Sequence, residues 1–563
     1  MSHNILVCDE IAAEGLEILK RAGQVETLSA TLPEDQLCAK VPPYDALVVR
    51  SATKVTDKVI AAAPRLKVIG RAGVGVDNID VQAATQRGII VINSPEGNTV
   101  AAAEHALALL LSLARNIPQA NQSAKAGEWR RSEFMGAEVY QKTLGVVGVG
   151  KIGSLVAQRC KAFGMRVLGY DPYLSIERAA QLGIEKVGLD ELLATADFVT
   201  VHAAKTPETA GLVGAAELAK MKPTARLINC ARGGIVDEQA LYEALKTGTI
   251  AGAALDVFSQ EPPGAIPLFE LPNLIATPHL GASTHEAQEK VALDVAEQIV
   301  EVLRGGQPRS AVNSPAVPSE VMVQLAPYLH LVEQIGRMHA YFHKRAIRSV
   351  ELSYSGEIAE WSVAPLTPRF LVGLLSPQFE QPVNTVNARL IAESRGINVA
   401  ERKTQEPHDY ASLISTRVVS EGCEMTVDGT LFGRADPRIV RVNKYRTDIV
   451  PQGLTLFTWH YDRPGVIGKV GTLLGSNRIN IAGMQVGREY VGSHALMILS
   501  LDNPIPDELI RQIDAMEHIE SSTLVDFGPA PGAWFDTLTA LTLRQAQGHP
   551  ERSRRMSNVE GQS

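Results

Sequence analysis

Three residues combine the chemistry of a base, a carboxylate that orients it, and an anion clamp. His279 follows the apolar run 274–277, and an imidazole titrates near neutral pH, as a general base for a hydroxyl proton must. Glu261 could orient that ring and stabilise its charged form. Arg232 is permanently charged and can hold a carboxylate through two hydrogen bonds. Each residue alone could be a surface or capping group, but together they supply what hydride removal from a 2-hydroxy acid requires besides a cofactor.

A glycine motif upstream predicts the cofactor site. Gly148, Gly150 and Gly153 form Gly-x-Gly-x-x-Gly between an apolar run and an amphipathic helical pattern. The first glycine permits a tight turn, the second lets a pyrophosphate approach the backbone, and the third lets helix and strand pack closely. Asp171 ends the next apolar run, where a carboxylate would meet the adenosine ribose and repel the 2′-phosphate of NADP. We therefore expect NAD to bind here; the alternative is a glycine-rich turn without a ligand.

Two stretches before this motif also place polar groups at the ends of apolar runs. Arg50 and Ser51 follow one such run, and Arg71 follows another and precedes Gly73. Guanidinium groups match carboxylates and phosphates, and closely spaced glycines suggest backbone that approaches a ligand. We expect these residues to bind an anionic substrate, with surface ion pairing as the alternative for the two arginines.

The elements that must position these residues alternate between strand and helix patterns. Such alternation predicts parallel sheets in an α/β fold. The expected strands are 5–8, 46–49, 66–70, 89–92, 143–147, 166–170, 198–202, 226–230, 252–256 and 274–277. The expected helices include 12–22, 99–115, the segment that follows Gly153 and runs through Phe163, 189–196, 214–221, 237–247 and 286–304. In the long helix 99–115, we interpret His105 as a packed residue rather than a ligand.

Composition excludes several classes of protein. A chain of 563 residues exceeds one hydrophobic core, and 45% hydrophobic with 21% charged residues is typical of a soluble globular protein of several domains. The net charge of −8 provides no basic field for nucleic acid. The longest apolar stretch, 106–114, is too short to cross a membrane, and no signal-peptide pattern precedes the first strand. The five cysteines have no metal-binding spacing, so we expect a cytoplasmic protein without disulfides or a metal.

The motifs around these residues resemble the D-isomer-specific 2-hydroxyacid dehydrogenase family. The segments that carry the resemblance are 148–153, 229–234, 256–261 and 278–283. The resemblance implies that Arg232, Glu261 and His279 are the catalytic residues. It implies NAD as cofactor and further cofactor-binding residues, namely Lys151, Ile152, Cys230 and Asp256. It also implies a Rossmann-type nucleotide domain, residues 98–279, inserted in a flavodoxin-like substrate domain, residues 1–97 and 280–314.

Within that family, the segments 49–53, 71–78 and 103–109 resemble the members that oxidise 3-phosphoglycerate. The resemblance implies NAD-dependent oxidation of 3-phospho-D-glycerate to 3-phosphohydroxypyruvate, the first step of L-serine biosynthesis. It implies that Arg50 and Arg71 meet the anions of the substrate and that Asn98 lines the crevice. Trp129 and Arg131 would reach the site of a neighbouring subunit. The alternatives are a glycerate, hydroxypyruvate or 2-hydroxyglutarate dehydrogenase, or an NAD-sensing binding protein similar to the co-repressor relatives of the family.

The segment 315–453 has no catalytic spacing of its own. It begins with a Pro-rich linker and shows helical patterns at 320–343 and 383–395 and a strand pattern at 347–354. The segment 436–448 predicts a strand with one basic edge, which is either a solvated face or an anion-binding surface. In position and length, 315–453 resembles the intervening domain, of the kind that binds substrate allosterically, found in long members of the family.

Residues 454–528 resemble an ACT domain, a small module that binds amino acids. The patterns follow the order βαββαβ, and the motif Asp-Arg-Pro-Gly starts at Asp462. The resemblance implies L-serine as an effector bound by His460, Asp462 and Asn480. Because such modules pair, it implies a homodimer or a homotetramer. We interpret the polar segment 529–563 as a disordered tail; a short basic arm for nucleic acid is the alternative.

Overall fold

The computed structural model describes residues 3–306, 308–315, 319–379, 382–405, 409–433 and 435–529. Their contacts divide them into two compact units, which are described separately. The first contains the described residues up to 54, residues 70–78 and residues 92–306; the second contains residues 55–69, residues 79–91 and the described residues from 308 onwards. The tail predicted at 529–563 lies outside the described residues, apart from Pro529. The domain boundaries named above stay predictions.

The first strands of the chain form a five-stranded sheet in the order β2-β1-β3-β4-β5. Its strands are β1 (His3–Val7), β2 (Gly23–Thr27), β3 (Ala46–Val49), β4 (Val68–Arg71) and β5 (Ile90–Ile92). The helices that alternate with them are α1 (Ala13–Lys20), α2 (Glu34–Lys40), α3 (Asp57–Ala61) and α4 (Val81–Gln86). β1 runs parallel to β2 and β3, and the strand order is the flavodoxin-like one that was predicted. The edge strand β2 escapes sequence prediction because only one of its five residues, Val25, has an apolar side chain.

The glycine motif belongs to a seven-stranded parallel sheet in the order β12-β11-β10-β9-β6-β7-β8. Its strands are β6 (Thr143–Val147), β7 (Arg166–Tyr170), β8 (Glu185–Lys186), β9 (Phe198–Val201), β10 (Arg226–Asn229), β11 (Gly252–Leu255) and β12 (Leu274–Ala276). The helices are α5 (Thr99–Ala114), α6 (Ile117–Lys125), α7 (Lys151–Ala162), α8 (Ile176–Leu182), α9 (Leu189–Thr195), α10 (Ala215–Lys220) and α11 (Glu238–Thr247). This is the Rossmann order extended by a seventh strand, as the fold prediction requires. Residues that follow β10, β11 and β12 therefore lie at one edge of the sheet.

Two long helices complete the first unit. α5 buries Ala103, Ala106 and Leu110 in the core beneath the seven-stranded sheet. α12 (His285–Leu303) packs on α1 so closely that a Cβ on Gly15 would lie 2.9 Å from the Cβ of Ala292. Among the described residues, no single helix has the length and apolar character to cross a membrane, and α5 with α6 meets that test only as a pair bent by 64°.

The second unit contains a six-stranded sheet in the order β14-β13-β15-β16-β17-β18. Its strands are β13 (Ile347–Gly356), β14 (Asn398–Thr404), β15 (Ser412–Ser420), β16 (Cys423–Phe432), β17 (Asp436–Val442) and β18 (Tyr445–Ile449). The helices are α13 (Ser319–Phe342), α14 (Leu366–Leu375) and α15 (Ala388–Ser394). The prediction of one strand over 436–448 is wrong, because the chain turns at Asn443, with φ of 51°, and β18 returns antiparallel to β17.

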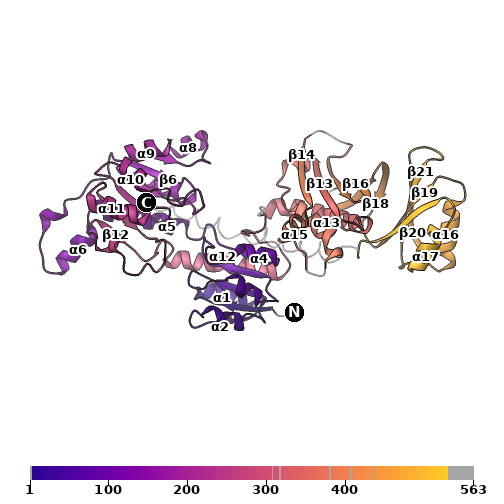
Figure 1. The fold of residues 1–563 in the computed structure, drawn as a ribbon, viewed down its shortest axis with the longest axis horizontal. Helices are drawn as coiled ribbons and strands as arrows, with labels where there is room; N and C mark the ends of the chain where they lie inside the picture. The colour runs from indigo at the N-terminus through magenta and orange to yellow at the C-terminus, as the bar shows by residue number, and fades with distance from the viewer. Residues whose placement is uncertain are drawn as a thin grey trace, which may run out of the picture. The chain divides into compact units, whose positions relative to one another are not determined.

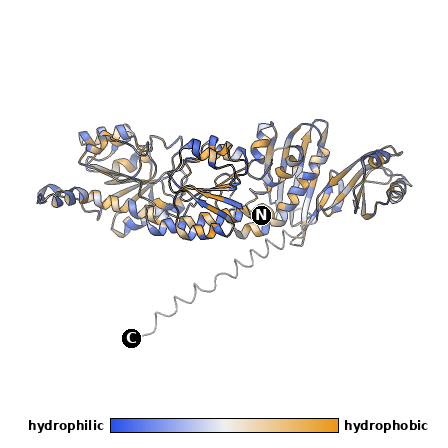
Figure 2. Cartoon of the chain, turned by 90° about the horizontal axis from the view of Figure 1, so that it is seen from below, coloured by the Kyte–Doolittle hydropathy of each residue, from blue (hydrophilic) through white to orange (hydrophobic). Residues whose placement is uncertain are grey.

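The last sheet has four antiparallel strands in the order β20-β21-β19-β22. Figure 1 labels β19, β20 and β21 of this sheet, drawn in yellow near the C-terminal end of the colour scale. In chain order its elements are β19 (Leu454–Tyr461), α16 (Val466–Ser476), β20 (Ile481–Arg488), β21 (His494–Leu501), α17 (Asp507–Asp514) and β22 (Ile519–Asp526). This is the predicted βαββαβ arrangement, and Val470, Leu474 and Ile513 of the helices contribute to its core. The helices of the protein carry both polar and apolar stretches in Figure 2, as helices with one face on a core do.

Candidate active site

The turn after β6 leaves space for a ligand at the start of α7. Gly148 has φ of 90°, and a Cβ there would lie 2.7 Å from the backbone nitrogen of Ala203. A Cβ on Gly153 would overlap the carbonyl oxygen of Gly148, whereas one on Gly150 would meet nothing within 4 Å. Gly150 is the N-cap of α7 and supplies no side-chain cap, so the first N–H groups of the helix can bind an anion. These features fit the pyrophosphate of a dinucleotide.

Asp171 follows β7 beside this turn. One carboxylate oxygen accepts the N–H of Val149 at 3.0 Å, and the other accepts the N–H of Tyr173 at 2.9 Å. A negative charge therefore lies next to the glycine-rich turn, where the ribose of a dinucleotide is expected. Of the other residues predicted at the cofactor, Lys151 is exposed and donates to Glu96 at 2.8 Å, and Ile152 packs against the core of the sheet.

We expect Asp171→Asn to reduce the preference for NAD over NADP. The amide keeps an oxygen for the N–H of Val149 but removes the charge that repels a 2′-phosphate. Loss of a charged hydrogen bond to the ribose corresponds to a fall of about 10- to 100-fold in kcat/KM for NAD, while kcat/KM for NADP rises. Steady-state kinetics with both cofactors measure the change. The same substitution at Asp190, a 76% exposed carboxylate paired with Lys220, is the control. If Asp171→Asn leaves the ratio of kcat/KM for NAD to kcat/KM for NADP unchanged, the assignment of Asp171 to the ribose is contradicted.

Glu261 and His279 form a hydrogen-bonded pair at the edge of this sheet. His279 Nδ1 lies 2.7 Å from Glu261 Oε2, and the two side chains are 43% and 37% exposed. The other oxygen of Glu261 accepts the N–H of Phe258 at 3.0 Å. The carboxylate thus fixes the ring through one nitrogen, which directs the role of base to Nε2.

The environment of Glu261 keeps it ionised. Burial acts to raise the pKa of this carboxyl, but the hydrogen bonds from His279 and from the N–H of Phe258 outweigh burial and lower the pKa. An ionised carboxylate stabilises the imidazolium that forms when the base takes a proton. Because the folded-state pKa is the lower one, this contribution to stability is present above the unfolded-state pKa and is lost as the pH falls through the folded-state value.

Arg232 lies with Arg71 against two glycines of the 71–78 segment. The Nε of Arg232 donates to Asp77 at 3.2 Å. A Cβ on Gly75 would overlap the guanidinium of Arg232, and a Cβ on Gly73, whose φ is 154°, would overlap that of Arg71. The spacing of these glycines is therefore explained by guanidinium groups that lie directly on the backbone.

Positive charge accumulates around Arg71. Burial first, and then repulsion from Arg232 and Arg50, lowers the pKa of Arg71 to about 10, although Asp77 opposes the shift. The Nε of Arg71 is buried and has no hydrogen-bond partner among the described residues. Arg50 donates to the carbonyl oxygen of Glu10 at 3.2 Å. Three guanidinium groups with an unsatisfied buried donor fit a ligand with more than one anionic group.

Asp9 and Asn78, which were not predicted as site residues, hold the loop that carries Arg50 and Ser51. Asp9 is 8% exposed and accepts the N–H of Arg50 at 2.6 Å and the hydroxyl of Thr53 at 2.7 Å. Asn78 donates to the carbonyl oxygens of Arg50 and Thr53 at 2.7 and 2.6 Å. Asp9 comes soon after β1, so the same signal that singles out Arg50, a polar group at a strand end, could have identified it.

Asn98 and Arg131 occupy different surroundings. Asn98 is the N-cap of α5 but makes no cap hydrogen bond, and its Oδ1 is buried without a partner among the described residues. Such an atom is available to a ligand. Arg131 begins the short helix η1 (Arg131–Phe134) and is exposed, as is Trp129 at 88%. Their reach into a neighbouring subunit stays a prediction.

Two residues expected at the cofactor differ in exposure, because Asp256 is buried whereas Cys230 is half-buried. Asp256 is 0% exposed, and its carboxylate accepts the N–H groups of Leu280 and Gly281 at 2.7 and 2.9 Å. The carboxylate of Asp256 thus binds the loop that carries His279, and its contact with a cofactor stays a prediction. For Cys230, burial and then the charge of Asp256 raise the pKa of the thiol, which favours its protonated form.

The predicted effector residues lie around the end of β19 and the start of β20. His460 is 1% exposed, with Nδ1 at 2.9 Å from the carbonyl oxygen of Tyr461 and Nε2 buried without a partner among the described residues. Asp462 accepts Arg488 Nη1 at 2.7 Å, and this hydrogen bond lowers the pKa of Asp462. Asn480 donates to Asp502 at 2.6 Å. Each of the three side chains thus makes a hydrogen bond within the chain, and His460 Nε2 is the buried atom left without one among the described residues.

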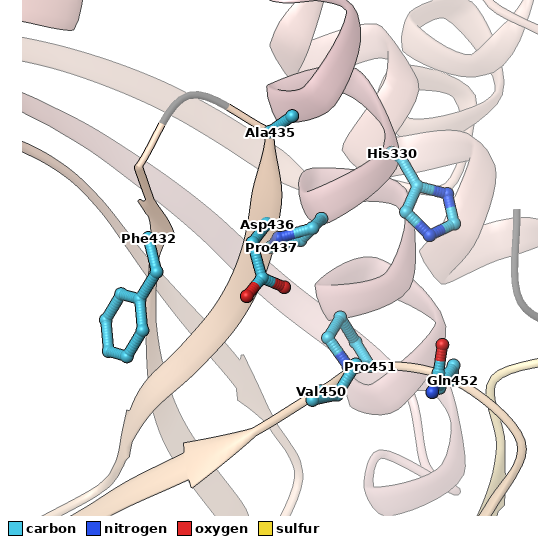
Figure 3. Close-up of a pocket in the computed structure, with 8 residues that line it drawn as sticks. All are labelled: His330, Phe432, Ala435, Asp436, Pro437, Val450, Pro451 and Gln452. Atoms are coloured by element: carbon cyan, nitrogen blue, oxygen red, sulfur yellow. The ribbon is translucent and has the colours of Figure 1, made fainter. Parts of the chain in front are cut away.

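The basic segment of the second unit is neutralised by carboxylates. Its four cations pair as Arg438 with Asp436 and Asp448, Arg441 with Asp428, Lys444 with Glu489, and Arg446 with Asp409. These pairs favour the interpretation as a solvated face over an anion-binding surface. A cavity of about 480 Å³ lies beside β17, and Figure 3 shows Asp436 on the strand and His330 on a helix among its lining residues. None of the residues discussed above as catalytic or cofactor-binding lines this cavity.

Three family models match the chain. The D-isomer specific 2-hydroxyacid dehydrogenase NAD-binding domain matches residues 107–281. The D-3-phosphoglycerate dehydrogenase intervening domain matches residues 324–443, and the ACT domain matches residues 454–518. The order of the three matches agrees with the order of the sheets along the chain.

Similar proteins extend over nearly the whole chain. A D-3-phosphoglycerate dehydrogenase of Synechocystis sp. is 51% identical over 92% of this chain and 94% of its own length, and one of Bacillus subtilis is 44% identical over 93% and 99%. Among solved structures, the TT0316 protein of Thermus thermophilus is 37% identical and superposes with a TM-score of 0.52 over 55% of this chain and 99% of its own. The protein thus binds NAD as a dehydrogenase, and the chain belongs to the D-3-phosphoglycerate dehydrogenases, a group within the D-isomer specific 2-hydroxyacid dehydrogenase family.

Proposed function

We propose that this chain oxidises 3-phospho-D-glycerate to 3-phosphohydroxypyruvate with NAD, the first step of L-serine biosynthesis. The observation that carries the proposal is that Arg50 and Arg232 lie close enough to Arg71 to lower its pKa, while Nε of Arg71 is buried without a hydrogen-bond partner among the described residues. A substrate with both a carboxylate and a phosphate matches this charge, whereas an unphosphorylated hydroxy acid leaves cations unpaired.

The residues divide the reaction between them. Arg232 holds the carboxylate and polarises the neighbouring oxygen, and Arg50 and Arg71 hold the phosphate. His279 takes the hydroxyl proton on Nε2, and Glu261 stabilises the resulting imidazolium. Gly148, Gly150 and Asp171 hold NAD, which supplies the hydride acceptor when it is bound. Each step by the protein is thus a proton transfer or the stabilisation of a charge.

Substrate selection tests this function. The full chain is incubated with NAD and 3-phosphoglycerate, D-glycerate or 2-hydroxyglutarate, and NADH is followed by absorbance. Loss of the phosphate removes charged hydrogen bonds, so kcat/KM for D-glycerate is expected to be at least about 100-fold lower than for 3-phosphoglycerate. Equal kcat/KM values for the phosphorylated and unphosphorylated acids would refute the proposal.

We also propose L-serine as an effector of the ACT domain and a homodimer or homotetramer as the assembly. The buried, unpartnered Nε2 of His460 supports a ligand at the end of β19. Asp462 can accept from an α-ammonium group, and Asn480 can both donate and accept. The exposed Trp129 and Met135, at 88% and 85%, support a subunit contact on the 117–140 segment.

Asn480→Ala is expected to raise the serine concentration for half-maximal inhibition by about tenfold, because one hydrogen bond to the effector is lost. The assay is initial rate against serine concentration at fixed 3-phosphoglycerate. Asn477→Ala is the matched control, since Asn477 lies three residues away and its amide donates to the carbonyl oxygen of Leu473 within its own helix end, at 2.8 Å. The same serine response in Asn480→Ala and in the unmodified chain contradicts the assignment.

A further inference from the structure

The loop that carries His279 is held by one buried carboxylate. Asp256 accepts the hydroxyl of Thr277 at 2.6 Å, the N–H of Leu280 at 2.7 Å and the N–H of Gly281 at 2.9 Å. The donors lie on both sides of His279 in the sequence. Because Asp256 has no exposed surface, water does not replace a donor that moves away.

His279 needs this support because its backbone is strained. Its φ is 56°, in the left-handed region that residues with a Cβ adopt only at a cost in free energy. Such a conformation persists where the surroundings fix it. Here the N–H of His279 donates to the carbonyl oxygen of Thr277 at 3.0 Å, and Asp256 binds both flanks. The direction of the catalytic ring therefore depends on the position of Asp256.

A histidine from a different element is also hydrogen-bonded to Asp256. His105, on α5, places Nε2 3.1 Å from Asp256 Oδ1 and 3.2 Å from the hydroxyl of Thr277. Its side chain is 19% exposed. Burial acts to raise the pKa of Asp256, but its hydrogen bonds, led by the one from His105, lower the pKa and keep the carboxylate ionised. His105 is thus more than a packed helix residue.

We propose that His105 is a positioning residue for the dehydrogenase reaction: through Asp256 and Thr277 it fixes the loop that presents His279 to the substrate. The inference rests on the proposed function in one respect, that His279 is the base, and it holds for whichever 2-hydroxy acid is oxidised. His105 acts through Asp256 and is not itself a proton carrier.

Two substitutions separate this role from packing. His105→Leu fills the space of the ring on α5 with an apolar side chain that has no donor, whereas His105→Gln places an amide nitrogen the same number of bonds from Cα as Nε2. In the leucine variant we expect kcat to fall about 10- to 100-fold, because the base is misplaced, with KM for NAD and substrate within about twofold of the unmodified values. The glutamine variant is expected to recover most of kcat. His285→Leu, on the exposed first turn of α12, is the control.

Amide hydrogen exchange provides a second readout that needs no substrate. Leu280 and Gly281 donate their N–H groups to Asp256, so their exchange is expected to speed up about tenfold in His105→Leu and to slow again in His105→Gln. If His105→Leu does not fold, Thr277→Val, which removes a second donor to Asp256 at constant shape, is expected to give the same loss of kcat and faster exchange.

The outcomes distinguish the two proposals. An unmodified chain that oxidises D-glycerate as well as 3-phosphoglycerate refutes the proposed substrate, and the variants are then compared on the better acid. Unchanged kcat in His105→Leu overturns the positioning role. Leucine and glutamine variants that are equally impaired, with unchanged exchange at Leu280 and Gly281, also overturn it, because the defect is then one of packing.

Discussion

His279→Ala is expected to lower kcat for 3-phosphoglycerate oxidation by about 10²–10⁴-fold, the usual contribution of a general base. The structure gives the reason: Glu261 holds the imidazole through Nδ1 at 2.7 Å, which orients Nε2 and stabilises its protonated form. Because the proposed binding site for NAD is the turn after β6, the KM for NAD is expected to change little. Stopped-flow or steady-state formation of NADH measures the loss.

Two further variants make the test of His279 more specific. His285→Ala replaces an exposed histidine six positions along the chain and is expected to retain full activity. Glu261→Gln keeps a hydrogen-bonding group but removes the charge, so it is expected to lose less activity than His279→Ala, by about 10- to 100-fold. Full activity in His279→Ala, or equal effects of His279→Ala and His285→Ala, would exclude His279 as the base.

Arg232→Ala is expected to lower kcat by about 10²–10³-fold and to raise the KM for 3-phosphoglycerate. Loss of one preorganised donor to a developing oxyanion has an effect of this size. The guanidinium also contributes to the positive charge around Arg71, so its removal weakens binding of the substrate carboxylate. The two parameters are separated by initial rates over a range of 3-phosphoglycerate concentrations at saturating NAD.

The control for Arg232 lies on the strand that precedes it. Arg226, at the opposite end of β10, donates to the carbonyl oxygen of Thr224, and its replacement by alanine is expected to leave kcat and KM unchanged. Arg232→Lys keeps the charge without the planar fork and is expected to recover only part of the activity. If Arg232→Ala and Arg226→Ala behave alike, Arg232 does not bind the reacting part of the substrate.

The sequence by itself determined the features that depend on local chemistry. The steric needs of a tight turn explain why Gly148 and Gly153 identify the nucleotide motif, and the structure shows the overlaps that a Cβ would cause there. Both parallel sheets follow from apolar runs that alternate with helical patterns. Arg232, Glu261 and His279 could be grouped because each follows a strand, and neighbouring parallel strands end at one edge of the sheet.

Tertiary structure decided what depends on contacts between distant segments. His105 and Asp256 are 151 residues apart, so helical periodicity reports only that His105 belongs to a helix, not that a buried carboxylate lies 3.1 Å away. The basic segment is a hairpin whose cations meet carboxylates from other strands and loops, including Asp428 and Glu489. Asp256 is named by its motif, but only the fold shows that its charge serves a loop. Hydrogen bonds between distant residues leave no periodic trace in a sequence, and these are what hold the catalytic side chains in place.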